Sequence, residues 1–145
     1  MKIYNSALPA FAAMISLVLS SCEKEAGEGG TSKITGKVYQ IQYDASFQTA
    51  VDTVPANDED VYIIYGNEGS TYDDDFKTSF DGSFKFEFLQ KGTYRLFAYS
   101  DDSTGAYNGN LNPESRDVPV IVEVSVSNNG GEAISPTIYI LKNNQ

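Results

Sequence analysis

The fold class is decided by residues 83–88, which read SFKFEF and alternate strictly between polar and apolar side chains. Successive side chains of a β-strand point to opposite faces of a sheet. The phenylalanines therefore share one face, and Ser83, Lys85 and Glu87 share the other. We predict a half-buried antiparallel strand here.

The same period of two appears on both sides of this stretch. It predicts further strands at Lys33–Ile41, Val61–Gly66, Phe76–Phe80, Thr93–Ser100, Val118–Val126 and Ile134–Leu141. Asp81-Gly82 predicts a two-residue hairpin between Phe80 and Ser83. Pro136 predicts a bulge or a sheet edge in the last strand. The fold class is thus all-β, with seven short strands forming an antiparallel-type β-sandwich.

The inward positions of these strands give a predicted core. Its members are large apolar or aromatic residues: Phe84, Phe86, Phe88, Tyr94, Leu96, Val120, Val122, Val124, Ile138 and Ile140. A body of about 110 residues buries enough surface to fold without disulfides.

Composition excludes several classes of function. The 145 residues allow one domain, and the net charge of −10 without a basic run argues against nucleic-acid binding. The absence of histidine excludes Ser-His-Asp chemistry and imidazole metal sites. A single cysteine cannot form an internal disulfide or a zinc finger. No P-loop, G-x-S-x-G or G-x-G-x-x-G motif is present, so we predict a non-enzyme, with a carboxylate-dependent hydrolase as a weaker alternative.

The amino terminus, residues 1–21, has the pattern of a signal peptide. Lys2 precedes an apolar run from Ala7 to Leu19, which is shorter than the ~20 residues that span a bilayer. The run ends in Leu19-Ser20-Ser21-Cys22, which resembles a bacterial lipobox. That resemblance implies cleavage before Cys22 and acylation of Cys22, with palmitate among the acyl groups. A buried free cysteine or an ordinary secretory cleavage site are the alternatives.

Residues 22–32 form the next predicted unit, the lipidated cysteine followed by a flexible acidic tether. An acidic stretch in this place resembles the surface-export signal of some Gram-negative lipoproteins, which implies an outer-membrane, cell-surface location. A plain solvated linker is the alternative. The β-sandwich domain is predicted at residues 33–142.

Four segments in a fixed order resemble the transthyretin-like, carboxypeptidase-regulatory-like domains. They are Gly36-Lys37-Val38, Val61–Tyr65, Thr78 with Asp81–Phe86, and Leu89 with Lys91–Leu96. The resemblance implies a prealbumin-like β-sandwich that serves as an accessory or binding module, and it carries no catalytic residue. Long connections at Gln42–Asp60 and Asp101–Asp117 depart from the family pattern.

Acidic clusters raise the question of calcium. Asp73, Asp74, Asp75, Asp101 and Asp102 could supply the oxygen ligands that Ca²⁺ prefers. Their spacing does not follow an EF-hand, because Lys77 stands where an oxygen donor is required. The alternative is a solvated acidic surface that needs no cofactor.

Aromatic residues suggest a binding surface. Phe97 and Tyr99 lie on the opposite side of their strand from Tyr94, Leu96 and Ala98, so one set faces solvent. With Tyr39, Tyr62, Tyr107 and Tyr139 they could form a platform for sugar rings or a protein partner. The alternative is that a second layer or the long loops cover them.

Two tripeptides resemble O-glycosylation sites of exported proteins in some Gram-negative bacteria. They are Asp52-Thr53-Val54 and Asp102-Ser103-Thr104, with Thr53 and Ser103 as acceptors. Ordinary turn chemistry is the alternative.

These observations predict a non-enzymatic lipoprotein that is held in the membrane through Cys22. Its β-sandwich would act as a binding or structural accessory module at the cell surface, with a surface protein complex or a glycan as partner. The alternative function is calcium-dependent adhesion or glycan binding.

Overall fold

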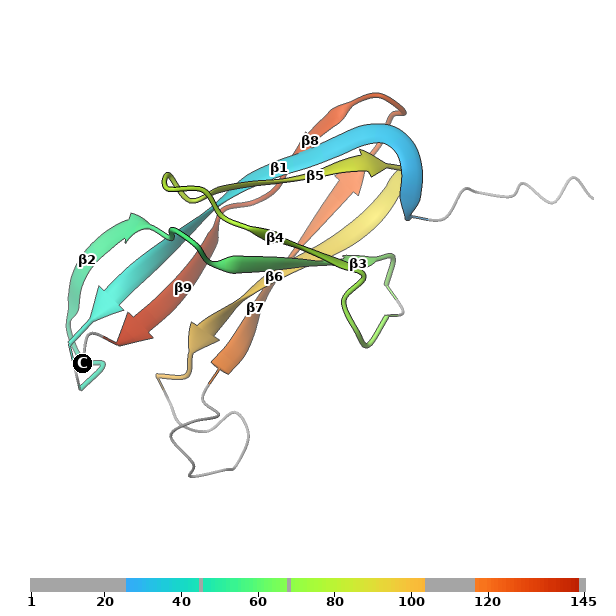
Figure 1. Ribbon diagram of the computed structural model, residues 1–145. Helices are drawn as coiled ribbons and strands as arrows, with labels where there is room; N and C mark the ends of the chain where they lie inside the picture. Colours follow the sequence, from blue (N-terminus) through green and yellow to red (C-terminus); the bar gives the residue numbers. More distant parts are fainter. Residues whose placement is uncertain (1–25, 45, 68, 104–116, 144–145) are drawn as a thin grey trace, which may run out of the picture.

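The computed structural model describes residues 26–44, 46–67, 69–103 and 117–143, and this part of the chain is built from β-strands without a helix (Figure 1). The strands are β1 (Glu28–Tyr43), β2 (Ala50–Pro55), β3 (Asp60–Tyr65), β4 (Asp74–Lys77), β5 (Ser83–Leu89), β6 (Gly92–Asp101), β7 (Asp117–Val126), β8 (Glu132–Ile134) and β9 (Ile138–Asn143). Among these residues there is accordingly no helix of the length and hydropathy that crossing a membrane requires.

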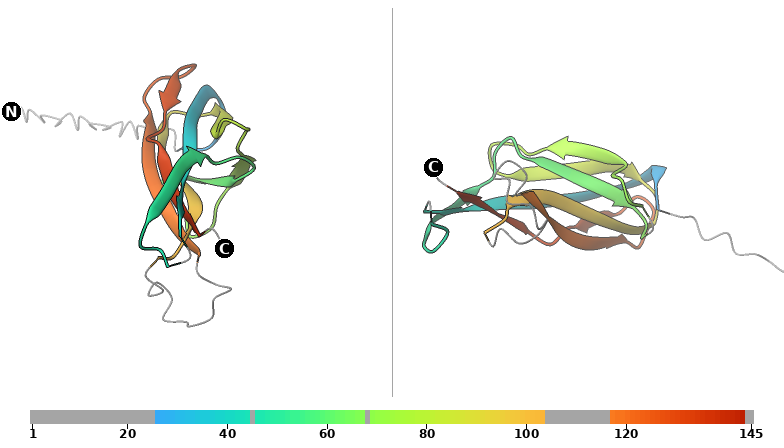
Figure 2. Two further views of the ribbon diagram at one scale, coloured as in Figure 1. Left: turned by 90° about the vertical axis from the view of Figure 1, so that its left-hand side faces the viewer. Right: turned by 90° about the horizontal axis from the view of Figure 1, so that it is seen from below.

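Two sheets pack face to face as a β-sandwich that is elongated along its strands (Figure 2). The five-stranded sheet is organised around β1. Strands β5 and β2 pair antiparallel with successive halves of β1, and β8 and β9 pair parallel with it. The four-stranded sheet has the order β4-β3-β6-β7 and is antiparallel throughout.

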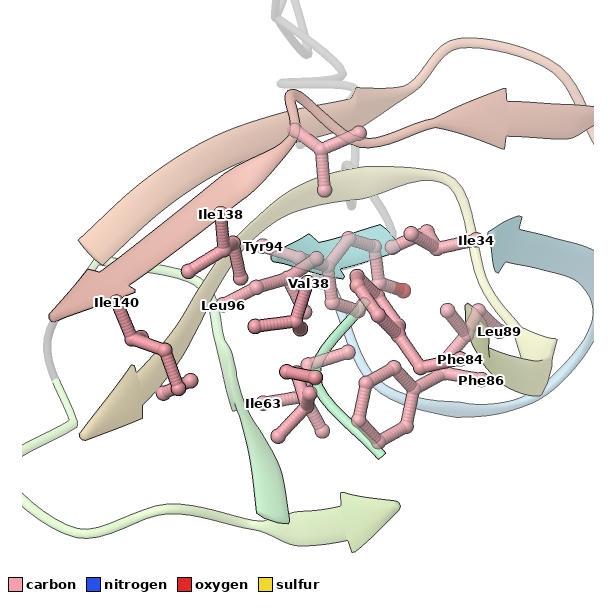
Figure 3. Packing of buried hydrophobic residues seen from close by; sticks show 14 of the residues in the cluster. Ile34, Val38, Ile63, Phe84, Phe86, Leu89, Tyr94, Leu96, Ile138 and Ile140 are labelled. Atoms are coloured by element: carbon pink, nitrogen blue, oxygen red, sulfur yellow. The ribbon is translucent and has the colours of Figure 1, made fainter. Parts of the chain in front are cut away.

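The core lies between the sheets, and both contribute to it (Figure 3). Ile34, Val38, Ile138 and Ile140 from the β1 sheet face Ile63, Tyr94 and Leu96 from the other sheet, and all seven are fully buried. Most of the predicted core is confirmed, including Phe84, Phe86 and Val124. Val120 and Val122 are only partly buried and pack against the margin of the cluster.

Phe88 is the one predicted core residue that the structure places outside. Its side chain is 70% exposed, and Leu89 is buried in its stead. Between the pairs Ser32↔Leu89 and Ile34↔Phe86 the β5 strand carries one extra residue, which is a β-bulge. Phe88 adopts a positive φ of 60° at this bulge. The bulge reverses the alternation, so the prediction was wrong for this residue.

The strand count also differs from the prediction, because nine strands are described rather than seven. Strand β2 lies within the segment 42–60 that was predicted as a connection. It is an edge strand with five of its six residues exposed, so its sequence has no apolar alternation to reveal it. The predicted last strand is divided at Pro136 into β8 and β9.

The direction of the last strands corrects the antiparallel prediction. After β7 the chain turns at residues 127–131 and crosses to the other sheet, where it runs alongside β1 in the same direction. Parallel neighbours need such a crossing connection rather than a tight hairpin.

The Asp81-Gly82 hairpin was also predicted wrongly. Strand β4 pairs with β3, whereas β5 pairs with β1, so the turn carries the chain from one sheet to the other. Gly82 has a positive φ of 74°, and a Cβ there would overlap the carbonyl oxygen of Val38. Only Gly82 of the pair has a positive φ, whereas a type I′ hairpin needs two such residues. The Asp-Gly signal therefore located a turn correctly but not its partner strands.

Strand β1 begins at Glu28 and not at Lys33, so residues 28–32, which were predicted as tether, belong to the sandwich. The Tyr94 hydroxyl donates to the carbonyl of Gln90 at 2.6 Å and accepts from the Gly27 amide at 3.1 Å. Gln90 Nε2 donates to the Glu28 carbonyl at 2.6 Å. A Cβ on Gly30 would overlap the Leu89 carbonyl, so the glycine permits a close approach that composition alone did not suggest.

Candidate functional site

The outer face of the four-stranded sheet gathers aromatic side chains from two strands and a connection. Tyr62 of β3 pairs in register with Phe97 of β6, which pairs in turn with Ile121 of β7. Tyr99 follows Phe97 on the same side of β6, and Tyr72 reaches the face from the β3–β4 connection. We call Tyr62, Tyr72, Phe97, Tyr99 and Ile121 the aromatic face.

Tyr62 is the centre of this face. Its ring stacks on Phe97 with centroids 5.0 Å apart and an interplanar angle of 20°. The rings of Tyr72 and Tyr99 lie 4.7 Å and 5.7 Å from it, and Phe97 meets Tyr99 edge to face at 5.5 Å. These are the separations at which aromatic pairs attract one another. The cluster is therefore a packed unit and not a scatter of single rings.

Exposure divides the rings into a floor and a rim. Phe97 is 8% exposed and forms the floor, while Tyr72 and Tyr99 are 53% and 39% exposed. Ile121, which is 54% exposed, extends the apolar surface on the β7 side. The result is a shallow apolar surface whose hydroxyl-bearing rings remain accessible.

Hydrogen bonds at Gly69 and Asp73 hold the backbone on either side of Tyr72. Arg95 Nη2 donates to the Gly69 carbonyl at 2.8 Å. The Asp73 amide donates to the Ile63 carbonyl at 2.8 Å, and Asp73 Oδ2 accepts from the Tyr65 amide at 2.7 Å. Tyr72 therefore does not have to be ordered when a ligand binds, which reduces the entropic cost of binding.

Carboxylates flank the aromatic face. Burial raises the pKa of the Tyr62 hydroxyl, and the negative charges of Asp60 and Asp75 raise it further. Asp60 is bridged by Lys77 at 2.9 Å. The edge of the face near β4 thus offers carboxylate acceptors beside tyrosine hydroxyls, which can both donate and accept hydrogen bonds.

The predicted aromatic platform is divided between two opposite faces. Tyr62, Phe97 and Tyr99 meet as described, but Tyr39 and Tyr139 form a separate pair, with centroids 6.0 Å apart, where β1 pairs with β9. Tyr107 lies outside the described residues. Sequence analysis missed Tyr72 because it lies in a connection, where no strand period indicates the direction of a side chain.

The outer face of the five-stranded sheet is mainly polar along β1 and β5. Lys33 bridges Glu132, Lys37 bridges Asp81 and Lys85 bridges Glu87, at distances from 2.9 to 3.2 Å. Hydrogen bonds from Ser83 and Lys37 lower the pKa of Asp81 to about 2. These charges satisfy one another and leave no concentrated charge for a ligand.

The residues proposed for calcium are not brought together. Asp74 pairs in register with Ile63 in the middle of β3, whereas Asp101 pairs with Asp117 where β6 ends and β7 begins. Asp101 Oδ2 accepts from the Asn143 amide at 2.7 Å, and Asp102 is largely buried. In the described ranges no group of three or more acidic, cysteine or histidine side chains could hold a metal ion.

A groove of about 480 Å³ lies between β7 and the β8 segment, away from the aromatic face. Glu123 and Glu132 both line it, so it holds the two carboxylates that a carboxylate-dependent hydrolase would need. However, hydrogen bonds from Thr35 and Lys33 lower the pKa of Glu132. A general acid needs a raised pKa, so Glu132 is not suited to be the acid of a hydrolase.

The predicted modification sites stand in different settings. Thr53 is exposed on the edge strand β2, and Ser103 is exposed after β6. Cys22 and the lipobox lie outside the described residues. Both hydroxyl residues are therefore sterically open.

Comparisons with known proteins give little further information. The chain matches no protein-family model and no curated protein. Among solved structures, it is similar to a candidate carbohydrate-binding protein of Pseudomonas aeruginosa, with 12% identity, a TM-score of 0.46, and 81% of this chain and 92% of that chain covered. It is also similar to (S)-allantoin synthase, with 17% identity and a TM-score of 0.35, over 79% of this chain and 42% of that chain.

Proposed function

We propose that this protein is a non-enzymatic, lipid-anchored binding module whose aromatic face binds a glycan. The observation that carries the proposal is the convergence of the Tyr72, Phe97 and Tyr99 rings on Tyr62. The C–H groups on one side of a sugar ring form an apolar surface that packs on an aromatic ring. The hydroxyls at the edge of the sugar then need hydrogen-bond partners.

The flanking groups meet that second requirement. The tyrosine hydroxyls of the rim and the carboxylates of Asp60 and Asp75 lie around the same rings. Carboxylates accept hydrogen bonds and hydroxyls both donate and accept, which matches the pattern of a sugar's hydroxyl groups. A surface that is apolar in the middle and rich in hydrogen-bonding groups at its rim suits a sugar better than a purely apolar ligand.

The size of the face distinguishes a glycan from a stable protein partner. A standard protein interface covers about 800 Å² and about 20–30 residues on each side. The aromatic face has four rings and one isoleucine, and ion-paired Asp60 and Lys77 lie next to it. A few sugar residues would cover it, whereas a protein partner would extend well beyond it.

The anchor and the location belong to the same proposal. The lipobox places an acylated cysteine at position 22, and the acidic residues behind it favour the outer membrane and the cell surface. The proposed domain type is transthyretin-like. Thr53 and Ser103, both exposed, are the proposed O-glycosylation sites.

The test is binding of a panel of neutral and acidic oligosaccharides to the full chain and to single variants. Tyr72→Ala and Tyr99→Ala remove exposed rim rings, and Tyr139→Ala removes a ring of similar exposure from the opposite face. We expect the rim variants to bind about tenfold more weakly and the Tyr139 variant to bind unchanged. The proposal would be contradicted if all three variants lost affinity equally, or if neither rim variant lost affinity.

Anchoring has its own test. Cells grown with a labelled fatty acid should incorporate the label into the wild-type protein and not into a Cys22→Ala variant. Equal labelling of the two proteins would reject the anchor and leave the glycan site standing.

A further inference from the structure

One end of the sandwich is formed by residues 27–31, 87–92 and 127–131, and we call it the amino-terminal end (Figure 1). Ala26 packs against the core, and Gly27 is bound on both its amide and its carbonyl by Tyr94 and Gln90. The chain is therefore fixed to the body from Ala26 onward.

The distance from this end to the proposed anchor has an upper limit. Cys22 and Ala26 are four residues apart. A fully extended chain spans at most ~3.6 Å per residue, so the two Cα atoms lie within ~14 Å of one another. The predicted tether ran to residue 32 and would have given the body far greater freedom. With the observed strand start, an acyl group on Cys22 must hold the amino-terminal end close to the lipid headgroups.

Phe88 gives this end an exposed aromatic side chain. It is 70% exposed and stands at the bulge of β5, beside the first residues of β1. Its φ of 60° is a conformation that residues other than glycine rarely adopt. Such an outlier persists only where the surrounding structure imposes it, and bulges often direct a side chain toward a function. Here the bulge turns a phenylalanine from the core into solvent.

Acidic residues are more numerous at one end of the molecule than at the other. The opposite end carries the acidic residues Asp44, Asp58, Glu59, Asp60, Asp101 and Asp117, with Lys77 and Lys142 as the neighbouring cations. The amino-terminal end is less acidic: Glu28, Asp74 and Glu87 line one hollow together with Lys85 and Phe88. Lys91 is exposed there and makes no ion pair within the described part of the chain. An anionic lipid surface attracts a free lysine and repels an acidic cluster.

From the reach of the anchor, the aromatic side chain and the charge, we propose that the amino-terminal end is a lipid-contact surface, with Phe88 inserted among the headgroups and Lys91 against lipid phosphates. Aromatic rings favour this interface of a bilayer. The proposal rests on the anchor at Cys22 that belongs to the proposed function. It fixes the body with its acidic end directed away from the membrane, which leaves the aromatic face accessible along the side of the sandwich.

The chain contains no tryptophan, so one introduced tryptophan is a unique fluorescent reporter. Phe88→Trp places it at the proposed contact. Phe80→Trp is the matched control, because Phe80 is 85% exposed in the turn beside Gly82, which lies against Val38 near the middle of β1. Each acylated variant, from which the signal peptide has been cleaved, is incorporated into vesicles of phosphatidylethanolamine and phosphatidylglycerol, with or without lipids brominated near the headgroup.

We expect the brominated lipids to reduce the fluorescence of the Phe88→Trp protein about twofold and to leave the Phe80→Trp protein unchanged. Equal fluorescence with both lipid types, in protein that floats with the vesicles, overturns the lipid-contact surface and leaves the anchor intact. Protein that stays in the aqueous fraction and lacks the acyl mass overturns both.

A second variant separates insertion from folding. Glycine accepts a positive φ, so Phe88→Gly should fold as the wild type does by circular dichroism. It should also lengthen the fluctuating distance between body and membrane, measured by energy transfer from a dye on the body to a labelled lipid. An unchanged transfer efficiency in this folded variant contradicts the proposal.

Discussion

The outer faces of the two sheets are built from the same kind of alternating strand, yet they differ in chemistry. On the β3–β6 side the outward positions hold Tyr62, Phe97 and Tyr99, whose rings pack on one another. On the β1–β5 side they hold lysines and acids in pairs, such as Lys33 with Glu132 and Lys85 with Glu87.

This difference suggests a way to tell a solvated polar surface from a binding surface. The test is whether the side chains of the surface already make their favourable contacts with one another. In the three ion pairs of the β1–β5 side, each charge has an opposite charge within 3.2 Å. The rings of the other side pack on one another only in part, because Tyr72 and Tyr99 keep large areas exposed to solvent. Unsatisfied apolar area is what a ligand can cover.

The largest expected difference between the faces is in stability. Phe97→Ala removes an almost buried ring on which Tyr62 stacks, and should lower the free energy of unfolding by about 3 kcal/mol. Tyr139→Ala removes a half-exposed ring from the other sheet and should cost below about 1 kcal/mol. Urea denaturation of the two variants measures both values. Similar losses would mean that the two aromatic groups are equally exposed in solution.

A smaller effect sharpens the same contrast through coupling between rings. In a double-mutant cycle, Tyr62→Leu and Phe97→Leu should show a coupling energy of about 1 kcal/mol, because stacked rings contribute beyond their buried area. The Tyr39 and Tyr139 pair, with its centroids 6.0 Å apart, should couple more weakly. A larger coupling in the second pair would contradict the assignment of the packed cluster to β3 and β6.

The ion pairs of the β1–β5 side should contribute still less. Lys33 and Glu132 are each 45% exposed, so solvent screens their attraction. Lys33→Gln should change the free energy of unfolding by at most about 0.5 kcal/mol, and added salt should abolish that change. A salt-independent loss of several times this size would show that the pair is desolvated.

The two faces should also respond to opposite extremes of pH. The pKa of Asp81 is lowered to about 2, so its contribution to stability is present above pH about 4 and lost as the pH falls toward 2. The pKa of Tyr62 is raised, so its contribution is present below pH about 10 and lost as the pH rises further.

Variants separate these two contributions. Asp81→Asn should flatten the acid side of the stability profile, and Tyr62→Phe should flatten part of the alkaline side, where Tyr65 and Tyr94 also contribute. Thermal melts across the pH range provide the measurement. An acid response that Asp81→Asn leaves unaltered would assign it to other carboxylates.

Sequence alternation predicted the all-β class, the positions of most strands and most of the core. The prediction failed where a β-bulge interrupts the alternation of side chains, and where both faces of a strand are exposed. Phe88 and Leu89 exchange places because of one bulge, and β2 has no apolar stripe to reveal it. The turn at Gly82 shows a third limit. The Asp-Gly dipeptide indicates that the chain turns, but it does not indicate to which sheet the next strand belongs.

The candidate site was predictable only in part for a related reason. Alternation correctly placed Phe97 and Tyr99 on the outward side of their strand. Which aromatic residues meet them depends on cross-strand register, which brings Tyr62 beside Phe97 and leaves Tyr39 in the other sheet. Tyr72 joins them because of hydrogen bonds made by Arg95 and Asp73, and the first of these links β6 to Gly69, 26 residues away in sequence.

Fluorine NMR of protein that carries fluorotyrosine tests the central claim most directly, because tyrosines on both outer faces report at once. During titration with the oligosaccharide that binds best, the resonances of Tyr62, Tyr72 and Tyr99 should shift together along one saturation curve. Those of Tyr39 and Tyr139 should stay in place. Shifts confined to Tyr39 and Tyr139, or saturable binding that moves none of the five resonances, would contradict the assignment of the aromatic face as the binding surface.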